Sequence, residues 1–497
     1  MPVKPHLIIR ADASARMGIG HVMRCLALAQ AWQDLGGSAA LLSHQLPLSL
    51  IERLSQEGVE HLPLVSLEDD AARTCAEAEA ADWVVMDGYH FTAAHVHEVA
   101  QSNANLLILD DLGQFTRGPM ALILNQNISS DLIGYSQHEG NPGLLLGGRF
   151  SLLRREFRCR PMKRDFIEPC QRVLVTLGGS DPQQISAKVI HALFKIPNLH
   201  ARIVVGAVNE RMESLRALCM SSGGRLELLS EVREMAPLMD WAQLAVSAGG
   251  SSVLELASRG LPTLLIIAAN NQQAVCECLG GRGIMLNAGW HDRLDSDQIA
   301  QLIKSLAEDA VRRATMAQRG LRIADGYGAL RVAREMLARS AAAQISLRPA
   351  EASDVRMVFE WASDRRSFSL ASIDEFIDWP AYRSWFLSDL QSDCCRIWIA
   401  RNPGGQAVGM VAFRVKEGRE AALSLHMNPE FPDSKTASAV LLVACRDLID
   451  SGFADQATAQ IKRTDIAAFR NLGCAGFREL ESPLEMVGGE TARMVWD

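Results

Sequence analysis

The sequence predicts an α/β protein made of two parallel-sheet halves followed by a smaller domain of strands and helices. Short apolar runs alternate with helix-like stretches from the start of the chain, and a second series of the same kind begins at residue 172. This alternation is typical of parallel sheets. It becomes less regular after residues 338–350, a small-residue stretch that we expect to be a linker, and tryptophan is more frequent beyond it. We therefore expect domains at 1–160, 165–338 and 345–497.

The elements of the first half follow from its apolar runs. Strand-like runs occur at 7–9, 39–43, 83–87 and 106–110. Helix-like segments such as 45–58 and 92–102 stand between them, so each strand is expected to be parallel to its neighbours.

The second half repeats the pattern after a charged stretch at 154–166. Its strand-like runs and the turns that follow them lie in "RVLVTLGGSDPQ" (172–183), "ARIVVGA" (201–207), "LAVSAGGSSVLELASRG" (244–260) and "PTLLIIA" (262–268). Glycines directly after a strand indicate turns in which the backbone can approach a ligand closely.

Composition narrows the class of protein. The 497 residues are 48% hydrophobic and 22% charged, with a net charge of −8, so a nucleic-acid partner is not expected. No apolar run reaches the roughly 18 to 20 residues that span a bilayer, and we expect a cytoplasmic chain without a membrane partner. The 11 cysteines lack the spacing of a zinc or redox motif, so we expect reduced thiols.

The stretch "RADASARMGIGHVMRC" (10–25) is the first candidate site. Gly18 and Gly20 let the chain turn sharply between a strand and a helix, at the sheet edge where ligands bind. His21 follows them and has the chemistry of a general base near neutral pH. The alternative is a histidine that only packs against the loop.

Two glycine-rich turns in the second half are candidate phosphate sites. Backbone amides and hydroxyls at a helix start can bind phosphate oxygens. The residues concerned are Gly179, Ser180, Gly250, Ser251 and Ser252. Glu255, about one helical turn further on, is expected to accept hydrogen bonds from a ribose diol. Each turn taken alone is also consistent with a plain tight turn.

Several motifs, taken together in order, resemble the UDP-sugar hydrolase family of pseudaminic acid biosynthesis. They include "RADASARMGIGHVMRCLALA", "VVMDGYHF", "LILDDL", "LNQN", "LLLGGRFSLLRREF", "VLVTLGGSDP", "SAGGSSVLELASRGLPTLLIIAANNQ" and "ADGYGALRVA". The resemblance covers about residues 5–338. It implies a GT-B-like pair of Rossmann-type domains and hydrolysis of UDP-2,4-diacetamido-2,4,6-trideoxy-β-L-altropyranose to the free sugar and UDP, with His21 as the base.

The same resemblance implies further substrate contacts. Asn271 and Gln272 match a family segment, although Asn270 stands where an acidic residue is common. Asp12, Tyr89 and Asn127 fall in motifs that face the crevice, as do Gly18 and Gly20. For the first three, hydrogen bonding that only fixes the loops is the alternative role.

The reaction needs a water, a base and stabilisation of the departing UDP. Because UDP is a good leaving group, one base is chemically sufficient, unlike the two carboxylates of ordinary glycosidases. No aspartate-rich D-x-D run suggests a metal clamp, so we expect no metal and no cofactor for the hydrolase. A GT-B glycosyltransferase that transfers the sugar to an acceptor and a non-catalytic nucleotide-sugar sensor are the alternatives.

The segment 345–497 resembles the GNAT N-acetyltransferases. Such enzymes hold the pyrophosphate of acetyl-CoA, their cofactor, with a glycine-rich turn. Here the turn reads "FPDSKTASAVLL" (431–442), without glycine and with Asp433 in it. We expect weak acetyl-CoA binding or none, so the domain is either degenerate or, as the alternative, makes the chain a bifunctional hydrolase and N-acetyltransferase.

Overall fold

In the computed structural model the chain forms two compact units, Met1–Val332 and Ala333–Asp497. The structure describes residues 4–14, 18–102, 105–115, 120–130, 133–135, 142–159, 161, 164, 166, 170–178, 181, 183–206, 209, 211–230, 232–364, 366–370, 378–415, 419–431, 434–479 and 491–496.

The first unit begins with a parallel sheet of strand order β3-β2-β1-β4-β5-β6-β7. Its strands are β1 His6–Ala11, β2 Ser38–Ser43, β3 Glu60–Pro63, β4 Trp83–Asp87, β5 Asn105–Leu109, β6 Leu122–Asn125 and β7 Gly143–Leu146. The pairing is parallel from strand to strand. The carboxyl ends of β1, β4 and β5 therefore lie side by side, and the residues that follow them meet at one edge of the sheet.

Helices connect these strands, as the sequence predicts. They are α1 Gly20–Asp34, α2 Leu48–Gln56, α3 Asp70–Ala78 and α4 Ala93–Ala100. One apolar cluster joins strand residues such as Ile8, Val84 and Ile108 to Ala78 of α3 and Val96 of α4. Helix α1 is largely buried along its length, and most of its residues are apolar.

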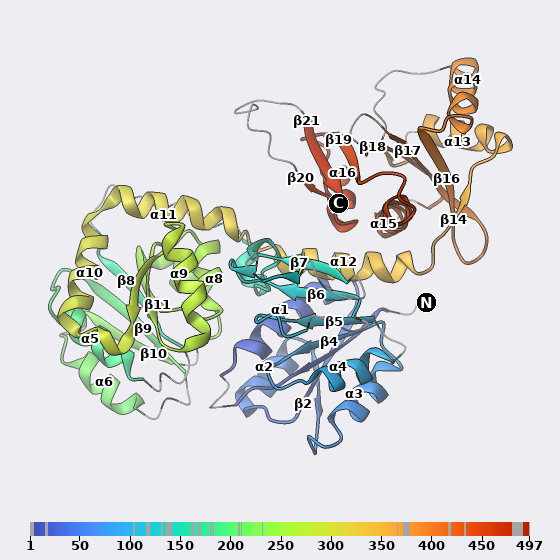
Figure 1. Cartoon of the computed structure of the whole chain (residues 1–497). Helices are drawn as coiled ribbons and strands as arrows, with labels where there is room; N and C mark the ends of the chain where they lie inside the picture. The colour runs from blue at the N-terminus through green and yellow to red at the C-terminus, as the bar shows by residue number, and fades with distance from the viewer. Residues whose placement is uncertain are drawn as a thin grey trace. The chain divides into compact units, whose positions relative to one another are not determined.

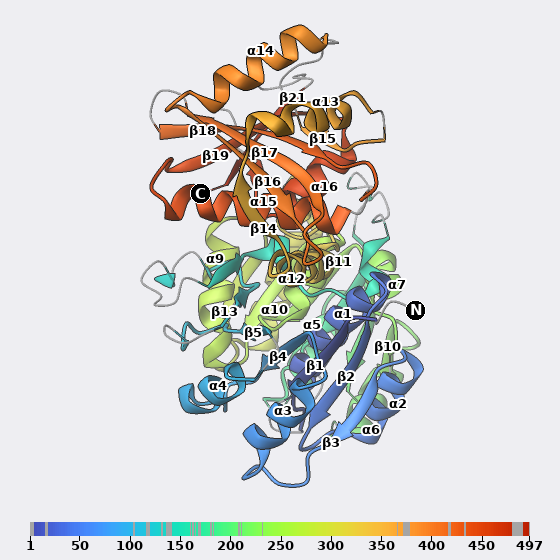
Figure 2. The ribbon, with the colours of Figure 1, turned by 90° about the vertical axis from the view of Figure 1, so that its right-hand side faces the viewer.

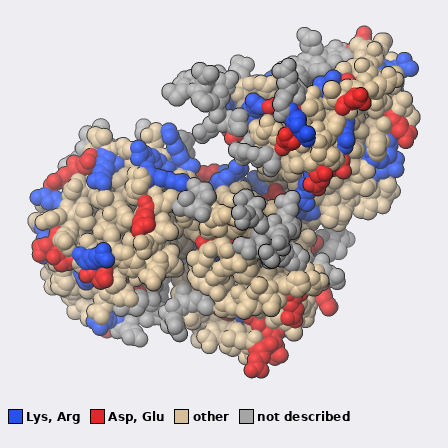
Figure 3. Space-filling model, in the orientation of Figure 1, with Lys and Arg blue, Asp and Glu red and all other residues tan. Residues whose placement is uncertain are grey.

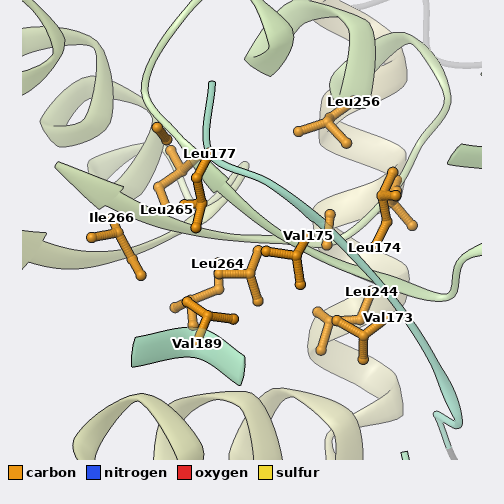
Figure 4. Close-up of a cluster of buried hydrophobic side chains, with 14 of the residues drawn as sticks. Val173, Leu174, Val175, Leu177, Val189, Leu244, Leu256, Leu264, Leu265 and Ile266 are labelled. Atoms are coloured by element: carbon orange, nitrogen blue, oxygen red, sulfur yellow. The ribbon is translucent and has the colours of Figure 1, made fainter. Parts of the chain in front are cut away.

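A second parallel sheet follows in the same unit, with strand order β10-β9-β8-β11-β12-β13. Its strands are β8 Arg172–Thr176, β9 His200–Val205, β10 Leu226–Ser230, β11 Leu244–Ala248, β12 Thr263–Ile267 and β13 Leu286–Trp290. Val173, Leu244 and Leu264 on its central strands belong to one buried cluster, drawn in Figure 4. Near-continuous apolar strands of this kind are typical of a sheet that helices cover on both faces.

The helices of this second half surround its sheet (Figure 1). They are α5 Ile185–Phe194, α6 Met212–Met220, α7 Ala236–Trp241, α8 Ser252–Ser258, α9 Gln273–Gly281, α10 Ser296–Glu308 and α11 Ala310–Ile323. Helix α12, Gly328–Ala342, then contains the border between the two units. The linker predicted at 338–350 is wrong for residues 338–342, because this alanine-rich stretch continues the helix to Ala342.

The second unit has a mixed sheet of strand order β14-β16-β17-β18-β19-β21-β20, with β15 also paired to β18. Its strands are β14 Ser346–Pro349, β15 Ser369–Leu370, β16 Cys395–Arg401, β17 Ala407–Val415, β18 Glu420–Met427, β19 Gln456–Lys462, β20 Arg478–Glu479 and β21 Thr491–Trp496. Its helices are α13 Val355–Ser363, α14 Trp379–Leu390, α15 Ser434–Asp450 and α16 Ile466–Cys474. Among the strand pairs that the structure describes in this sheet, β18 and β19 are parallel and all the others are antiparallel.

The two faces of this mixed sheet carry separate cores. Ile397 and Ile399 of β16 pack with α13 and α14, whereas Trp398 and Ala400 of the same strand belong to the cluster that includes α15 and α16. Successive side chains of a strand point to opposite faces, which produces this division. Figure 2 shows the helices of this unit on both sides of its strands.

The structure confirms the predicted fold class, two parallel Rossmann-type sheets followed by a mixed GNAT-like sheet. On the face shown in Figure 3, Lys and Arg are interspersed with Asp and Glu, as the modest net charge leads one to expect. None of the helices that the structure describes combines the length and the apolar character needed to cross a membrane.

Candidate active site

The loop between β1 and α1 has the geometry that its glycines predict. Gly18 has a φ of +81°, a conformation that side chains other than glycine rarely adopt. Helix α1 begins at Gly20, so His21 lies in its first turn. His21 is only 8% exposed, more buried than a side chain at the open mouth of a crevice.

Two polar groups face His21 Nδ1: Asp87, which is the nearer, and Arg24 Nη2 at 3.3 Å. Asp87 ends β4, is fully buried, and places Oδ1 2.6 Å from His21 Nδ1. Burial alone would raise the pKa of Asp87, but the charge of Arg24 and the hydrogen bonds from Arg24 and His21 outweigh it and hold that pKa well below its usual range. An ionised carboxylate only accepts hydrogen bonds, so Nδ1 donates, and the proton-free nitrogen of the neutral ring is Nε2.

Arg24 joins two carboxylates of the site. It follows His21 by three residues and is therefore on the same face of α1. Its Nε and Nη2 donate to the two oxygens of Asp87, each at 2.6 Å, and its Nη1 donates to Asp111 Oδ2 at 2.8 Å. Asp87 and Asp111 are thus held by one guanidinium.

Asp111 also binds two residues that the sequence marks as substrate contacts. Tyr89 donates its hydroxyl to Asp111 Oδ2 at 3.1 Å, and Asn127 Nδ2 donates to Oδ1 at 3.0 Å. Burial and the Asp111 charge raise the pKa of Tyr89, so the phenol keeps its proton. The Tyr89 ring lies edge-on to the His21 ring, with centroids 4.9 Å apart, and is 42% exposed.

Asp12 lies at the same sheet edge, but its oxygens are already occupied. It accepts from the His44 backbone amide at 2.7 Å and pairs with Arg10 at 2.8 Å. Arg10 in turn binds Asp70 through two 2.7 Å bonds. This arrangement favours the loop-fixing role over a substrate contact for Asp12.

The glycine turn after β11 lies close to the loop of His21. A Cβ atom added at Gly20 would lie 3.5 Å from Ser251 Oγ. The side chain of Ser251 is exposed, and Ser252 begins α8. The structure therefore brings together the Gly18–Gly20 loop and the Gly250–Ser252 turn, which are more than two hundred residues apart in the sequence.

Gln272 binds the backbone on either side of α8, at Gly249 and at Ala268. Its Oε1 accepts from the backbone amides of Gly249 at 3.2 Å and Ala268 at 3.0 Å. The oxygen of this amide is therefore engaged in fixing the loop, whereas Asn271 beside it is exposed. The predicted phosphate contacts Gly179 and Ser180 lie outside the described residues.

Glu255 in the first turn of α8 has a charged partner. Its Oε1 lies 3.2 Å from Arg154 Nη2, and Arg154 also donates to Glu156 at 2.8 Å. Burial raises the pKa of Glu255, an effect that Arg154 opposes. The carboxylate proposed to bind ribose thus already shares an arginine with a second carboxylate.

Sequence reasoning missed Arg24, Asp87, Asp111 and Arg154. All four stand inside motifs quoted for the resemblance, and two signals were available. Arg24 is three residues after His21 on one helix face, and the two aspartates come at the carboxyl ends of neighbouring strands. Which side chains pair across that edge depends on strand order, which the sequence did not supply.

The structure also bears on a metal site and on an acetyl-CoA site. In the described part of the chain, no group of three or more His, Cys, Asp or Glu side chains could hold a metal ion. Acetyl-CoA carries amide groups that could pair with an open strand edge. Strand β18 pairs with β19 only as far as Ala422, and beyond that residue β15 pairs with β18. The Met427 amide donates to the Phe368 carbonyl at 3.0 Å.

This occupied edge does not fit an amide-bearing cofactor arm. The Ser367 hydroxyl donates to the Met427 carbonyl at 2.5 Å, so both backbone groups of Met427 are satisfied within the chain. Asp433, which the sequence analysis places in the pyrophosphate turn, lies outside the described residues. Weak acetyl-CoA binding therefore stays a prediction. It rests on the absence of glycine from the turn at 431–442 and on the paired edge of β18.

Comparisons with known proteins give the following similarities. Residues 172–325 match the profile of the Glycosyltransferase family 28 C-terminal domain. The chain is 22% identical over 331 residues to the spore coat polysaccharide biosynthesis protein SpsG of Bacillus subtilis, covering 66% of this chain and 96% of that protein.

Two solved structures are also similar. MurG of Acinetobacter baumannii is 14% identical, with a TM-score of 0.46, over 66% of this chain and 98% of its own. Spermidine N-acetyltransferase of Vibrio cholerae, solved with CoA and spermine, is 15% identical, with a TM-score of 0.27, over 31% of this chain and 95% of its own.

Proposed function

We propose that the first unit is a nucleotide-sugar enzyme that hydrolyses UDP-2,4-diacetamido-2,4,6-trideoxy-β-L-altropyranose to the free sugar and UDP. The order of motifs over residues 5–338 supports the substrate and the reaction. The family 28 match at 172–325 and the likeness to a polysaccharide biosynthesis protein support the broader class, a nucleotide-sugar enzyme.

The observation that carries the proposal is the arrangement around His21. Asp87 binds Nδ1 and leaves Nε2 as the acceptor nitrogen, which is the form of imidazole that a general base requires. The ring lies beside the exposed Tyr89, and the residue before His21, Gly20, approaches Ser251. A sugar bound between these loops would have a base at one side and hydroxyl and amide donors at the other.

The proposed reaction balances as a simple displacement. A water oxygen forms a bond to the anomeric carbon while the bond from that carbon to the UDP oxygen breaks, and UDP leaves with the electron pair. His21 Nε2 accepts the proton of the water. Attack from the face opposite UDP gives inversion at the anomeric carbon.

The second half is proposed to hold UDP. The Gly250–Ser252 turn would donate to the diphosphate, and Gly179 and Ser180 are proposed to do the same. Glu255, whose Oε1 lies 3.2 Å from Arg154 Nη2, would accept hydrogen bonds from the ribose. We propose that no metal takes part, because UDP leaves readily once its charge meets these donors.

UDP release from the diacetamido sugar nucleotide tests the proposal, with EDTA in a parallel reaction. We expect turnover that EDTA does not change. Replacing His21 with Asn should lower kcat by roughly 10²- to 10⁴-fold, the usual contribution of a general base, and leave UDP affinity nearly unchanged. Turnover within a few-fold of the parent would place the base elsewhere.

Transfer of the sugar to an acceptor is a second candidate, because the family 28 profile describes glycosyltransferases. Both reactions release UDP, so the sugar product distinguishes them. Free sugar formed in the absence of any acceptor supports hydrolysis. UDP release that begins only when an acceptor alcohol is added would favour transfer.

A further inference from the structure

We propose that Asp87 and Arg24 are positioning residues for His21: Asp87 fixes the tautomer of the imidazole and Arg24 fixes Asp87. This inference rests on the proposed function, in which His21 accepts the proton of the attacking water.

The first step is the state of Asp87. Its side chain is fully buried and both oxygens are engaged, Oδ1 by His21 and Arg24 and Oδ2 by Arg24 and, at 3.5 Å, by the Cys25 thiol. A carboxylate held at both oxygens cannot rotate away from the imidazole. His21 is therefore kept with its proton on Nδ1 and Nε2 open.

The second step is the role of Arg24. A buried carboxylate without a partner is costly, and the guanidinium fork matches both oxygens of Asp87 at once. Its remaining arm reaches Asp111 at 2.8 Å. A lysine at this position would keep the charge but could not make the paired bonds.

The third step concerns the ring of His21. Asp111, held by Arg24, also anchors the hydroxyl of Tyr89, whose ring lies edge-on to the imidazole at an interplanar angle of 83°. The imidazole is thus held at Nδ1 by Asp87 and packs in a T-shaped arrangement with Tyr89. Arg24 is the common support of both contacts.

The charges of the network also suit the proposed reaction. Asp87 and Asp111 carry two negative charges against the one positive charge of Arg24, so one negative charge remains beside the histidine. When His21 takes the proton of the water it becomes positive, and this net negative charge stabilises it. The same low-dielectric surroundings make the interaction stronger than it would be in water.

The test compares Asp87→Asn and Arg24→Lys with the parent in the full chain. The amide introduced by Asp87→Asn would offer its N–H to Nδ1 and thereby shift the imidazole proton to Nε2, which blocks the base. In serine proteases the equivalent change costs about 10⁴-fold in kcat. We expect Asp87→Asn to lower kcat by at least about 10²-fold and Arg24→Lys by at least about tenfold, each with UDP affinity unchanged.

A spectroscopic readout separates positioning from general stability. With ¹⁵N-labelled histidine, the imidazole resonances of His21, assigned by their loss in His21→Asn, report which nitrogen carries the proton. The parent should show the proton on Nδ1, and Asp87→Asn should show it on Nε2. If Asp87→Asn does not fold, kcat and the His21 tautomer are both measured in Arg24→Lys. In that variant His21 should exchange between the two tautomers.

Two matched controls make the same chemical changes away from the site. Asp82→Asn alters a carboxylate that accepts from the His6 amide, and Arg73→Lys alters a surface pair with Glu77. Both should leave kcat and the His21 tautomer as in the parent.

The outcomes are distinct. Parental kcat together with a retained Nδ1 proton in Asp87→Asn would overturn the inference. If the parent releases no UDP from the sugar nucleotide, the proposed function fails, while the tautomer measurement still decides whether Asp87 and Arg24 position His21.

Discussion

Glu255 and His21 show two ways in which buried charge is compensated at the level of single residues. His21 is bound by a carboxylate that Arg24 keeps ionised, whereas Glu255 is itself a buried carboxylate that shares Arg154 with Glu156. Burial raises the pKa of Glu255 and therefore works against the charged form. A ribose diol that donates hydrogen bonds would favour that charged form.

Replacing Glu255 with Gln should weaken UDP binding. Charge-assisted hydrogen bonds to the ribose would be lost, so we expect a cost of roughly 1.5 to 3 kcal/mol. Isothermal titration calorimetry with UDP measures it. Glu156→Gln is the control, since Glu156 shares Arg154 but is not proposed to touch UDP. Equal affinities in the two variants would leave Glu255 only a helix N-terminal charge.

His426 on β18 gives a pH-dependent prediction for the second unit. Burial lowers the pKa of His426 from 6.5 to about 4. The unfolded chain therefore takes up the proton first as the pH falls, and the folded state loses stability between about pH 6.5 and pH 4. The full loss is about 3 kcal/mol.

Hydrogen exchange of peptides that cover β18 measures this effect. In the parent, protection should fall as the pH is lowered through that window, after correction for the intrinsic exchange rate. His426→Asn lacks the titrating group and should show a flatter dependence. Identical pH dependence in both proteins would assign the titration to other groups.

At this scale the sequence identified the catalytic candidate but not its supports. The spacing of Gly18, Gly20 and His21 was enough to predict a close-approach loop, because backbone freedom and side-chain chemistry are local properties. Asp87 and Asp111 could not be paired with His21 and Arg24 without the strand order β1-β4-β5. Their roles depend on contacts between distant parts of the chain.

At the scale of the elements, the turn before α12 requires glycine at position 326. Gly326 has a φ of +83°, and a Cβ added there would lie 2.2 Å from the Phe157 carbonyl oxygen. Both the backbone conformation and the contact exclude a side chain. The segment 325–327 is thereby fixed against the 3-10 helix Arg155–Arg158, next to Arg154.

Gly326→Ala should therefore destabilise the first unit by at least about 2 kcal/mol, the sum of left-handed strain and overpacking. Chemical denaturation followed by circular dichroism checks the value. Gly281→Ala is the matched change, because a Cβ there meets nothing within 4 Å and its φ is not positive. Equal unfolding midpoints for the two variants would contradict the explanation.

The strands of the first unit could be predicted closely, and the course of α12 could not. Predicted runs such as 7–9 and 83–87 lie within β1 and at β4, because apolar residues bounded by turns specify buried parallel strands. The small residues from Ala338 resembled a linker by composition. Alanine is also the strongest helix former, and the helix continues through them to Ala342.

For the whole molecule, we expect UDP release by the first unit not to depend on the second unit. The backbone of Met427 is already paired within the chain, and the turn at 431–442 lacks glycine. Acetyl-CoA should therefore show no saturable binding in the micromolar range, and removal of residues 345–497 should leave UDP release largely intact. Equilibrium dialysis with labelled acetyl-CoA and the UDP assay check these two results.

Acetylation of an amino-sugar nucleotide by the full chain would contradict this expectation. It would mean that β15 leaves the edge of β18 when the cofactor binds, and the protein would be bifunctional. Ser367→Ala removes one bond that holds this segment and is the variant in which such opening should be easiest.

The most direct test of the central claim is hydrolysis in water enriched in oxygen-18, followed by mass spectrometry of both products. Attack of water on the anomeric carbon predicts the heavy oxygen in the free sugar and none in UDP, with both products formed roughly 10²- to 10⁴-fold more slowly in His21→Asn. Heavy oxygen in the phosphate of UDP would mean cleavage at phosphorus and would contradict the account.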